Sequence, residues 1–141
     1  MEKPKKVFLD APAEYDFDLI GMVSSLKSYV LASRLNKRLS LDFVRSNNLE
    51  TINKKDNGVS EFAVYEFNDD NLFITYRLFQ NKSKGVLLPQ YKNLDFFLCI
   101  AGDLKPSDLK VFAARFLEID GIQYSMLIDT ENLKGKEWLM F

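Results

Sequence analysis

The stretch from residue 61 to residue 79 limits the possible folds more than any other part of the chain. Residues 61–67 read as a strand with Phe62 and Val64 on one side and Ala63, Tyr65 and Phe67 on the other, and residues 72–79 alternate again. Between the two runs lies Asn68-Asp69-Asp70-Asn71, and Asn and Asp favour tight turns because their side chains bond to the nearby backbone. Two alternating runs on either side of such a turn predict an antiparallel hairpin.

A strand-helix-strand pattern lies on each side of this hairpin. Before it, strands are expected at 16–24 and 41–45, with a helix from about 26 to 39 between them. After it, strands are expected at 95–101 and 122–128, with a second helix that begins near Pro106. The polar stretch 46–60 is predicted to be a loop, residues 1–6 a basic leader, and residues 133–141 a tail with an apolar end.

This order predicts one α+β domain over residues 1–141, with a mostly antiparallel sheet and two helices packed on one face. It resembles a ferredoxin-like sandwich with an enlarged sheet. In the first helix Ser24 or Ser25 is the expected N-cap. The expected buried stripes are Tyr29, Ala32, Leu35 and Leu39 in the first helix, and Leu109, Phe112, Ala113, Phe116 and Leu117 in the second.

The residue content removes several classes of function. The chain has no His, which is the commonest general base and a frequent zinc ligand, and it has no Gly-rich phosphate-binding motif. We therefore expect no catalytic residue, cofactor or metal. The acidic pairs Asp16/Asp18 and Asp69/Asp70 are interpreted as a solvated strand end and as turn residues.

The charge balance and the hydrophobic pattern favour a cytoplasmic protein. The net charge of -1 gives no overall attraction to nucleic acid or to an anionic membrane. No apolar run reaches the ~18 residues of a membrane span. The single cysteine, Cys99, lies in an apolar run and is predicted to be a buried core residue in a reducing compartment.

The segment from Leu88 to Phe96, Leu-Pro-Gln-Tyr-Lys-Asn-Leu-Asp-Phe, resembles the motif of the IPExxxVDY family, small bacterial proteins of undefined function. Pro89 and Asp95 match that motif, Phe96 replaces its Tyr, and Gln90 replaces its Glu. Residues 16–36 and the ending 133–141 extend the similarity over nearly the whole chain. The resemblance implies no activity, substrate or catalytic residue. From its place before an apolar run, we expect Asp95 to bond to the 89–93 loop or to pair with a lysine.

Three functions remain open. The first is a non-enzymatic interaction domain that binds a protein partner or its own copy through a sheet edge, the tail or a basic helix face. The second is an RNA-associated protein that uses the basic face, and the third is a small-ligand-binding domain or a histidine-free enzyme that uses Asp95. The candidate contact residues are Lys27, Arg34, Lys37 and Arg38 on the helix face, and Trp138 and Phe141 in the tail.

Overall fold

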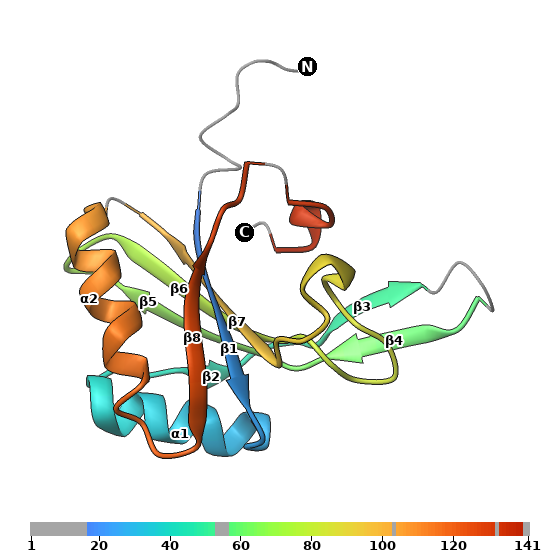
Figure 1. Ribbon diagram of the computed structural model, residues 1–141, viewed down its shortest axis with the longest axis horizontal. Helices are drawn as coiled ribbons and strands as arrows, with labels where there is room; N and C mark the ends of the chain where they lie inside the picture. The colour runs from blue at the N-terminus through green and yellow to red at the C-terminus, as the bar shows by residue number, and fades with distance from the viewer. Residues whose placement is uncertain (1–16, 53–56, 103, 132, 140–141) are drawn as a thin grey trace.

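The computed structural model describes residues 17–52, 57–102, 104–131 and 133–139. Its elements form a six-stranded sheet, a separate two-stranded sheet and two α-helices, which confirms the predicted α+β class (Figure 1). In chain order they are β1 (Asp18–Ser24), α1 (Ser28–Leu39), β2 (Val44–Arg45), β3 (Leu49–Ile52), β4 (Val59–Phe62), β5 (Val64–Asp69), β6 (Ile74–Gln80), the 3₁₀ helix η2 (Pro89–Tyr91), β7 (Phe96–Ala101), α2 (Pro106–Phe116), β8 (Ile122–Ile128) and the 3₁₀ helix η3 (Lys136–Leu139).

The large sheet has the strand order β2-β5-β6-β7-β1-β8, and every neighbouring pair is antiparallel. Because β1 lies between β7 and β8, the unit β7-α2-β8 is a split β-α-β in which β7 and β8 run in the same direction. The four strands β8-β1-β7-β6, with one helix after β1 and one after β7, have the arrangement of a ferredoxin-like sandwich. The strands β5 and β2 enlarge it beyond β6, so β8 and β2 form its two edges.

Both helices cover one face of this sheet. Residues from α1 and α2 share a single buried cluster with side chains of β1, β5, β6, β7 and β8. Two expected members are not in it. Tyr29 is 62% exposed because Leu31 takes the inward position, which places Tyr29 about 100° around the helix from the centre of the stripe. Leu117 is also exposed, since α2 ends at Phe116.

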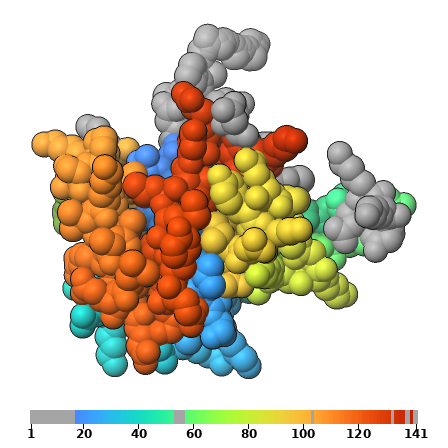
Figure 2. All heavy atoms as spheres, in the orientation of Figure 1, coloured from blue at the N-terminus to red at the C-terminus, as the bar shows by residue number. Residues whose placement is uncertain are grey.

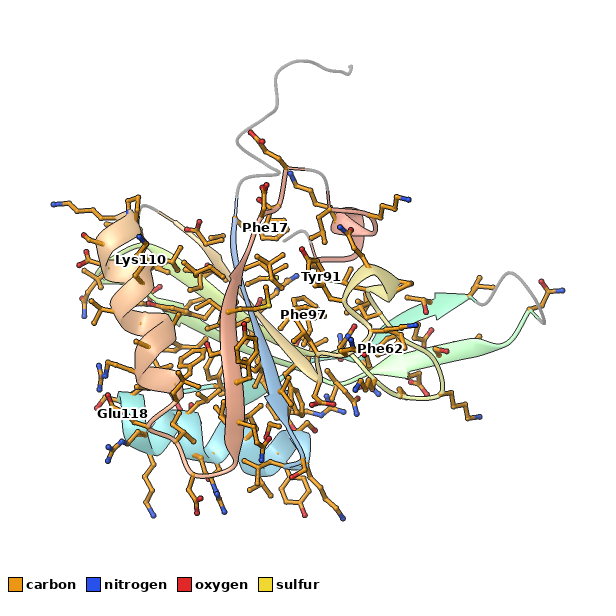
Figure 3. All side chains as sticks on the ribbon, in the orientation of Figure 1. Phe17, Phe62, Tyr91, Phe97, Lys110 and Glu118 are labelled. Atoms are coloured by element: carbon orange, nitrogen blue, oxygen red, sulfur yellow. The ribbon has the colours of Figure 1, made fainter. Side chains whose placement is uncertain are left out.

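Irregular segments cover the opposite face. The 81–95 loop and the 129–139 tail pack there over a second buried cluster, which Figure 3 shows around the labelled Phe17, Phe62, Tyr91 and Phe97. Gly21 of β1 makes this close packing possible: a Cβ at that position would collide with the side chains of Leu94 and Ile128. The sheet is therefore buried on both faces, and β7 at its centre has no exposed residue.

The stretch 46–60 is not the loop that its polarity predicted. It contains β3 and β4, which pair antiparallel from Leu49 opposite Phe62 to Ile52 opposite Val59. Figure 1 shows the two strands projecting from the rest of the molecule. Each strand has only four residues, too few for alternation to stand out against a polar surrounding. The predicted hairpin is confirmed as β5 and β6, although residues 61 and 62 belong to β4.

Three local predictions were also wrong in detail. The strand expected at 41–45 is limited to Val44–Arg45. Helix α1 begins at Ser28, and its N-cap Lys27 makes no side-chain capping bond. The Ser24 hydroxyl instead donates to the carbonyl oxygen of Gly121 (2.6 Å) and accepts from the backbone N–H of Leu26 (3.1 Å). It thereby ties the end of β1 to Gly121, the residue before β8, which is a tertiary role that no local pattern predicts.

Candidate functional site

The strand β8 is an edge of the six-stranded sheet, and three of its seven residues are exposed. It pairs with β1 on one side and with no described strand on the other. Its sequence, Ile-Gln-Tyr-Ser-Met-Leu-Ile, contains no charged residue, Pro or Gly. Figure 2 shows the segment around 122–128 running uncovered down the front of the molecule, beside the helix α2. Alternate N–H and C=O groups of an edge strand point outward, so β8 is an unsatisfied template for another strand.

The edge of β8 carries apolar side chains, and contacts at both ends and at the middle of the strand hold it in place. Tyr124 is 51% exposed and Leu127 is also exposed, on opposite faces of the sheet, while Ile122 and Ile128 at the two ends are buried. Between them, the Ser125 hydroxyl donates to the Ala113 carbonyl oxygen of α2 (3.1 Å). The strand is thus preorganised in the extended conformation that a partner strand would bind, which lowers the entropic cost of binding.

The opposite edge of the sheet is protected. The strand β2 there has only two residues, and one of them is the charged Arg45. The guanidinium of Arg45 lies 5.3 Å from the ring centre of Tyr65 and donates to the side-chain oxygen of Asn48. A short edge strand with a charged side chain is a common defence against pairing with other chains. In β8 the one such feature is a bulge opposite Val23 and Ser24, which leaves the pairing regular from Tyr124 onward.

The structure brings together part of the predicted basic face of α1. Arg34, Lys37 and Arg38 line a shallow pocket of about 410 Å³, whereas Lys27 lies at the other end of the helix. The pocket also contains acidic residues. Arg38 lies 3.2 Å from the Glu118 carboxylate, and Arg34 donates to the backbone carbonyl of Asp120 and lies 3.8 Å from its carboxylate. This surface therefore carries mixed charge, which suits phosphate binding less well than a uniformly basic face.

The motif residues all take part in holding the chain together. Asp95 accepts a hydrogen bond from the backbone N–H of Ser24 (2.9 Å) and lies 3.1 Å from the Lys82 ammonium group. The predicted lysine partner is confirmed, and the backbone bond goes to the end of β1 rather than to the 89–93 loop. Pro89 opens η2, and the Gln90 side chain accepts from the Lys134 N–H (3.2 Å). Phe96 is buried under the helices.

The buried side chain of Asn81 organises the loop from residue 81 to residue 95. Its exposed fraction is 0%. The amide nitrogen donates to the carbonyl oxygens of Tyr91 (3.0 Å) and Leu94 (2.7 Å), and the amide oxygen accepts from the Leu88 N–H (2.8 Å). The Leu88 N–H and the Leu94 carbonyl obtain their partner from this side chain, and the Tyr91 carbonyl, which also accepts from the Leu94 N–H (3.0 Å), obtains a second one. Asn81 thus fixes the loop that covers the second face of the sheet.

The described part of the tail folds back onto the same face. Leu133 and Leu139 are buried in the second cluster, and residues 136–139 form η3 rather than an edge strand. The side chain of Trp138 and the whole of Phe141 lie outside the described residues, as does Asp16.

The remaining titratable groups do not form a reactive arrangement in the described ranges. No three His, Cys, Asp or Glu side chains gather there as metal ligands would. Burial raises the pKa of the Cys99 thiol well above its usual value, and burial and then the Asp69 charge raise the pKa of Tyr76. Both shifts favour the protonated group, the reverse of what a nucleophile needs. Asp69 itself caps the hairpin turn by accepting from the N–H groups of Asn71 and Leu72.

The last residue of that turn, Phe73, combines two unfavourable features. Its φ is +55°, a left-handed conformation that costs a bulky residue about 1–2 kcal/mol, and its side chain is 86% exposed. We expect Phe73→Asn to raise the free energy of unfolding by about 0.5–1 kcal/mol, because Asn tolerates this conformation and no buried contact is lost. Chemical denaturation measures the change. Leu72→Asn in the same turn is the control, and equal effects of the two substitutions would contradict the explanation.

Neither described helix has the length and apolar character that crossing a bilayer requires. No protein-family model matches the chain, and a comparison with curated proteins finds no match.

Proposed function

We propose that this domain is a non-enzymatic interaction module that binds a protein by adding a strand to the outer edge of β8. One observation carries the proposal: β8 is a seven-residue edge strand without charge or Pro, and the other surfaces of its sheet are not open to an added strand. Both faces of the sheet are covered, and the β2 edge is short and charged. Backbone hydrogen bonds to β8 supply affinity, and the side chains next to the edge supply specificity.

The side chains around the edge indicate what kind of partner strand fits. Tyr124 offers an aromatic ring on the loop face, and Leu127 offers an aliphatic group on the helix face. Because β8 carries no charge, the paired segment of the partner is expected to be uncharged and to carry apolar residues on both faces. The buried, unreactive Cys99 is consistent with a reducing compartment, and we propose a cytoplasmic location.

The proposal is tested by placing charges on the edge. The double variant Tyr124→Lys/Leu127→Lys puts two lysines on β8, where they oppose strand pairing, and both positions are exposed. The matched control is Tyr29→Lys/Val111→Lys, which replaces two exposed apolar residues on the helices. Tagged copies of the original chain and of both variants are used to recover partners from nuclease-treated lysate, and the recovered complexes are quantified.

We expect the edge variant to lose bound protein by about tenfold or more, and the control to keep it. Equal retention by the two variants would contradict binding at β8. Loss of all partners upon nuclease treatment of the unsubstituted chain would instead favour the RNA-associated function.

A further inference from the structure

We propose that the strand added to β8 is the β8 strand of a second copy of this chain, in a two-fold symmetric antiparallel pairing centred on Ser125. This inference rests on the proposed function and names its partner. The result would be a dimer in which the two six-stranded sheets form one continuous sheet.

The first argument is the distribution of exposure along the strand. The two ends, Ile122 and Ile128, are buried, and the accessible residues run from Gln123 to Leu127. The midpoint of this accessible segment is Ser125. A second copy paired antiparallel about that point covers every accessible residue of both strands, and a shift of register in either direction leaves some of them uncovered.

The second argument is that the strand is chemically compatible with itself. In this register Tyr124 lies opposite Met126 of the second copy, and Gln123, the extra residue of the bulge, lies next to Leu127. No charged residue exists in β8, so no like charges meet across the axis, which is the usual penalty when a strand pairs with its own copy. An aromatic ring against a thioether is a favourable contact, and the small Ser125 at the axis allows close approach.

The size of the contact sets the expected strength. One pair of seven-residue strands buries less than the roughly 1,600 Å² of a standard stable interface. We therefore expect a dissociation constant on the order of micromolar, with monomer and dimer both present at ordinary working concentrations. Because no charge lies in the strand, this constant should change less than about twofold between low and high salt.

The test uses charge exchange at Gln123 and Leu127, the exposed residues at the two ends of the accessible segment, which this register brings next to each other across the interface. One chain carries Gln123→Lys/Leu127→Lys, and a second carries Gln123→Glu/Leu127→Glu. With itself, each chain would place like charges next to each other twice, whereas the mixed pair would place Lys next to Glu twice. Sedimentation of each chain and of their mixture measures the mass, for comparison with the 16.3 kDa of one chain.

We expect the original chain to approach twice the monomer mass as its concentration rises. Each variant alone is expected to have a dissociation constant at least about tenfold higher, and the mixture of the two variants is expected to recover the dimer. Recovery in the mixture also shows that both variants are folded. A chain that stays at 16.3 kDa at every concentration, or variants whose mixture is no more dimeric than either alone, would overturn the proposal. If the original chain is monomeric while the Tyr124→Lys/Leu127→Lys variant still loses a captured partner, self-pairing fails and strand addition by another protein stands.

Discussion

Replacing Asn81 by alanine is expected to lower the free energy of unfolding by about 3 kcal/mol or more, the largest effect we predict for a single polar residue. The substitution would remove three hydrogen bonds and leave the Leu88 N–H and the Leu94 carbonyl without their partner, while the Tyr91 carbonyl would keep only its bond from the Leu94 N–H. The site is fully buried, so the Asn81 side chain cannot simply be replaced by bulk solvent. Urea denaturation followed by tryptophan fluorescence or circular dichroism measures the loss.

The control for this substitution is Asn93→Ala, in the same loop and exposed. It removes the same atoms from a surface position and should change the free energy of unfolding by less than about 0.5 kcal/mol. A loss of less than about 1 kcal/mol for Asn81→Ala would show that the loop does not depend on the buried amide.

Replacing Leu139 by alanine is expected to cost about 2–4 kcal/mol, because the side chain is fully buried in the second cluster. The prediction tests whether the tail is part of the folded core. The matched control is Leu72→Ala, which makes the same change in an exposed turn and should cost less than about 0.5 kcal/mol. Similar small losses for both leucines would mean that the tail is not packed against the sheet in solution.

Much of the fold could be predicted because its signals are local. The strand β8 was predicted with both of its ends correct, since Gly121 marks its start and apolar residues fill it. The start of α2 at Pro106 and the turn at Asp69 also follow from the preferences of single residues. These features depend on a few neighbouring residues, which is the information a single sequence carries most directly.

The errors arose where distant segments decide the structure. Nothing near Asn81 in the chain indicates that its amide will be buried by residues 88–94, so the sequence pattern did not identify it as a core residue. Likewise Tyr29 and Leu31 are both plausible core residues of α1, and only the packing of the helix on the sheet chooses between them. Tertiary contacts override local pattern in both cases.

The candidate site could be predicted only in part. The absence of charge and Pro in 122–128 is visible in the sequence, but an uncharged strand is more often found in the middle of a sheet. The strand order places this one at the edge, and that order depends on long-range pairing of β1 with both β7 and β8. Because both faces of the six-stranded sheet are covered and its β2 edge is short and charged, β8 is the edge of that sheet open to another strand.

Amide hydrogen exchange along β8 tests this central claim most directly. The N–H groups of β8 that point away from β1 pair with no described strand, and pairing with an added strand would protect them. We predict that exchange in residues 122–128 slows by about tenfold or more in the associated protein, while exchange in β3 and β4 does not change. Exchange in β8 that stays equally fast at every protein concentration and in every recovered complex would contradict the account.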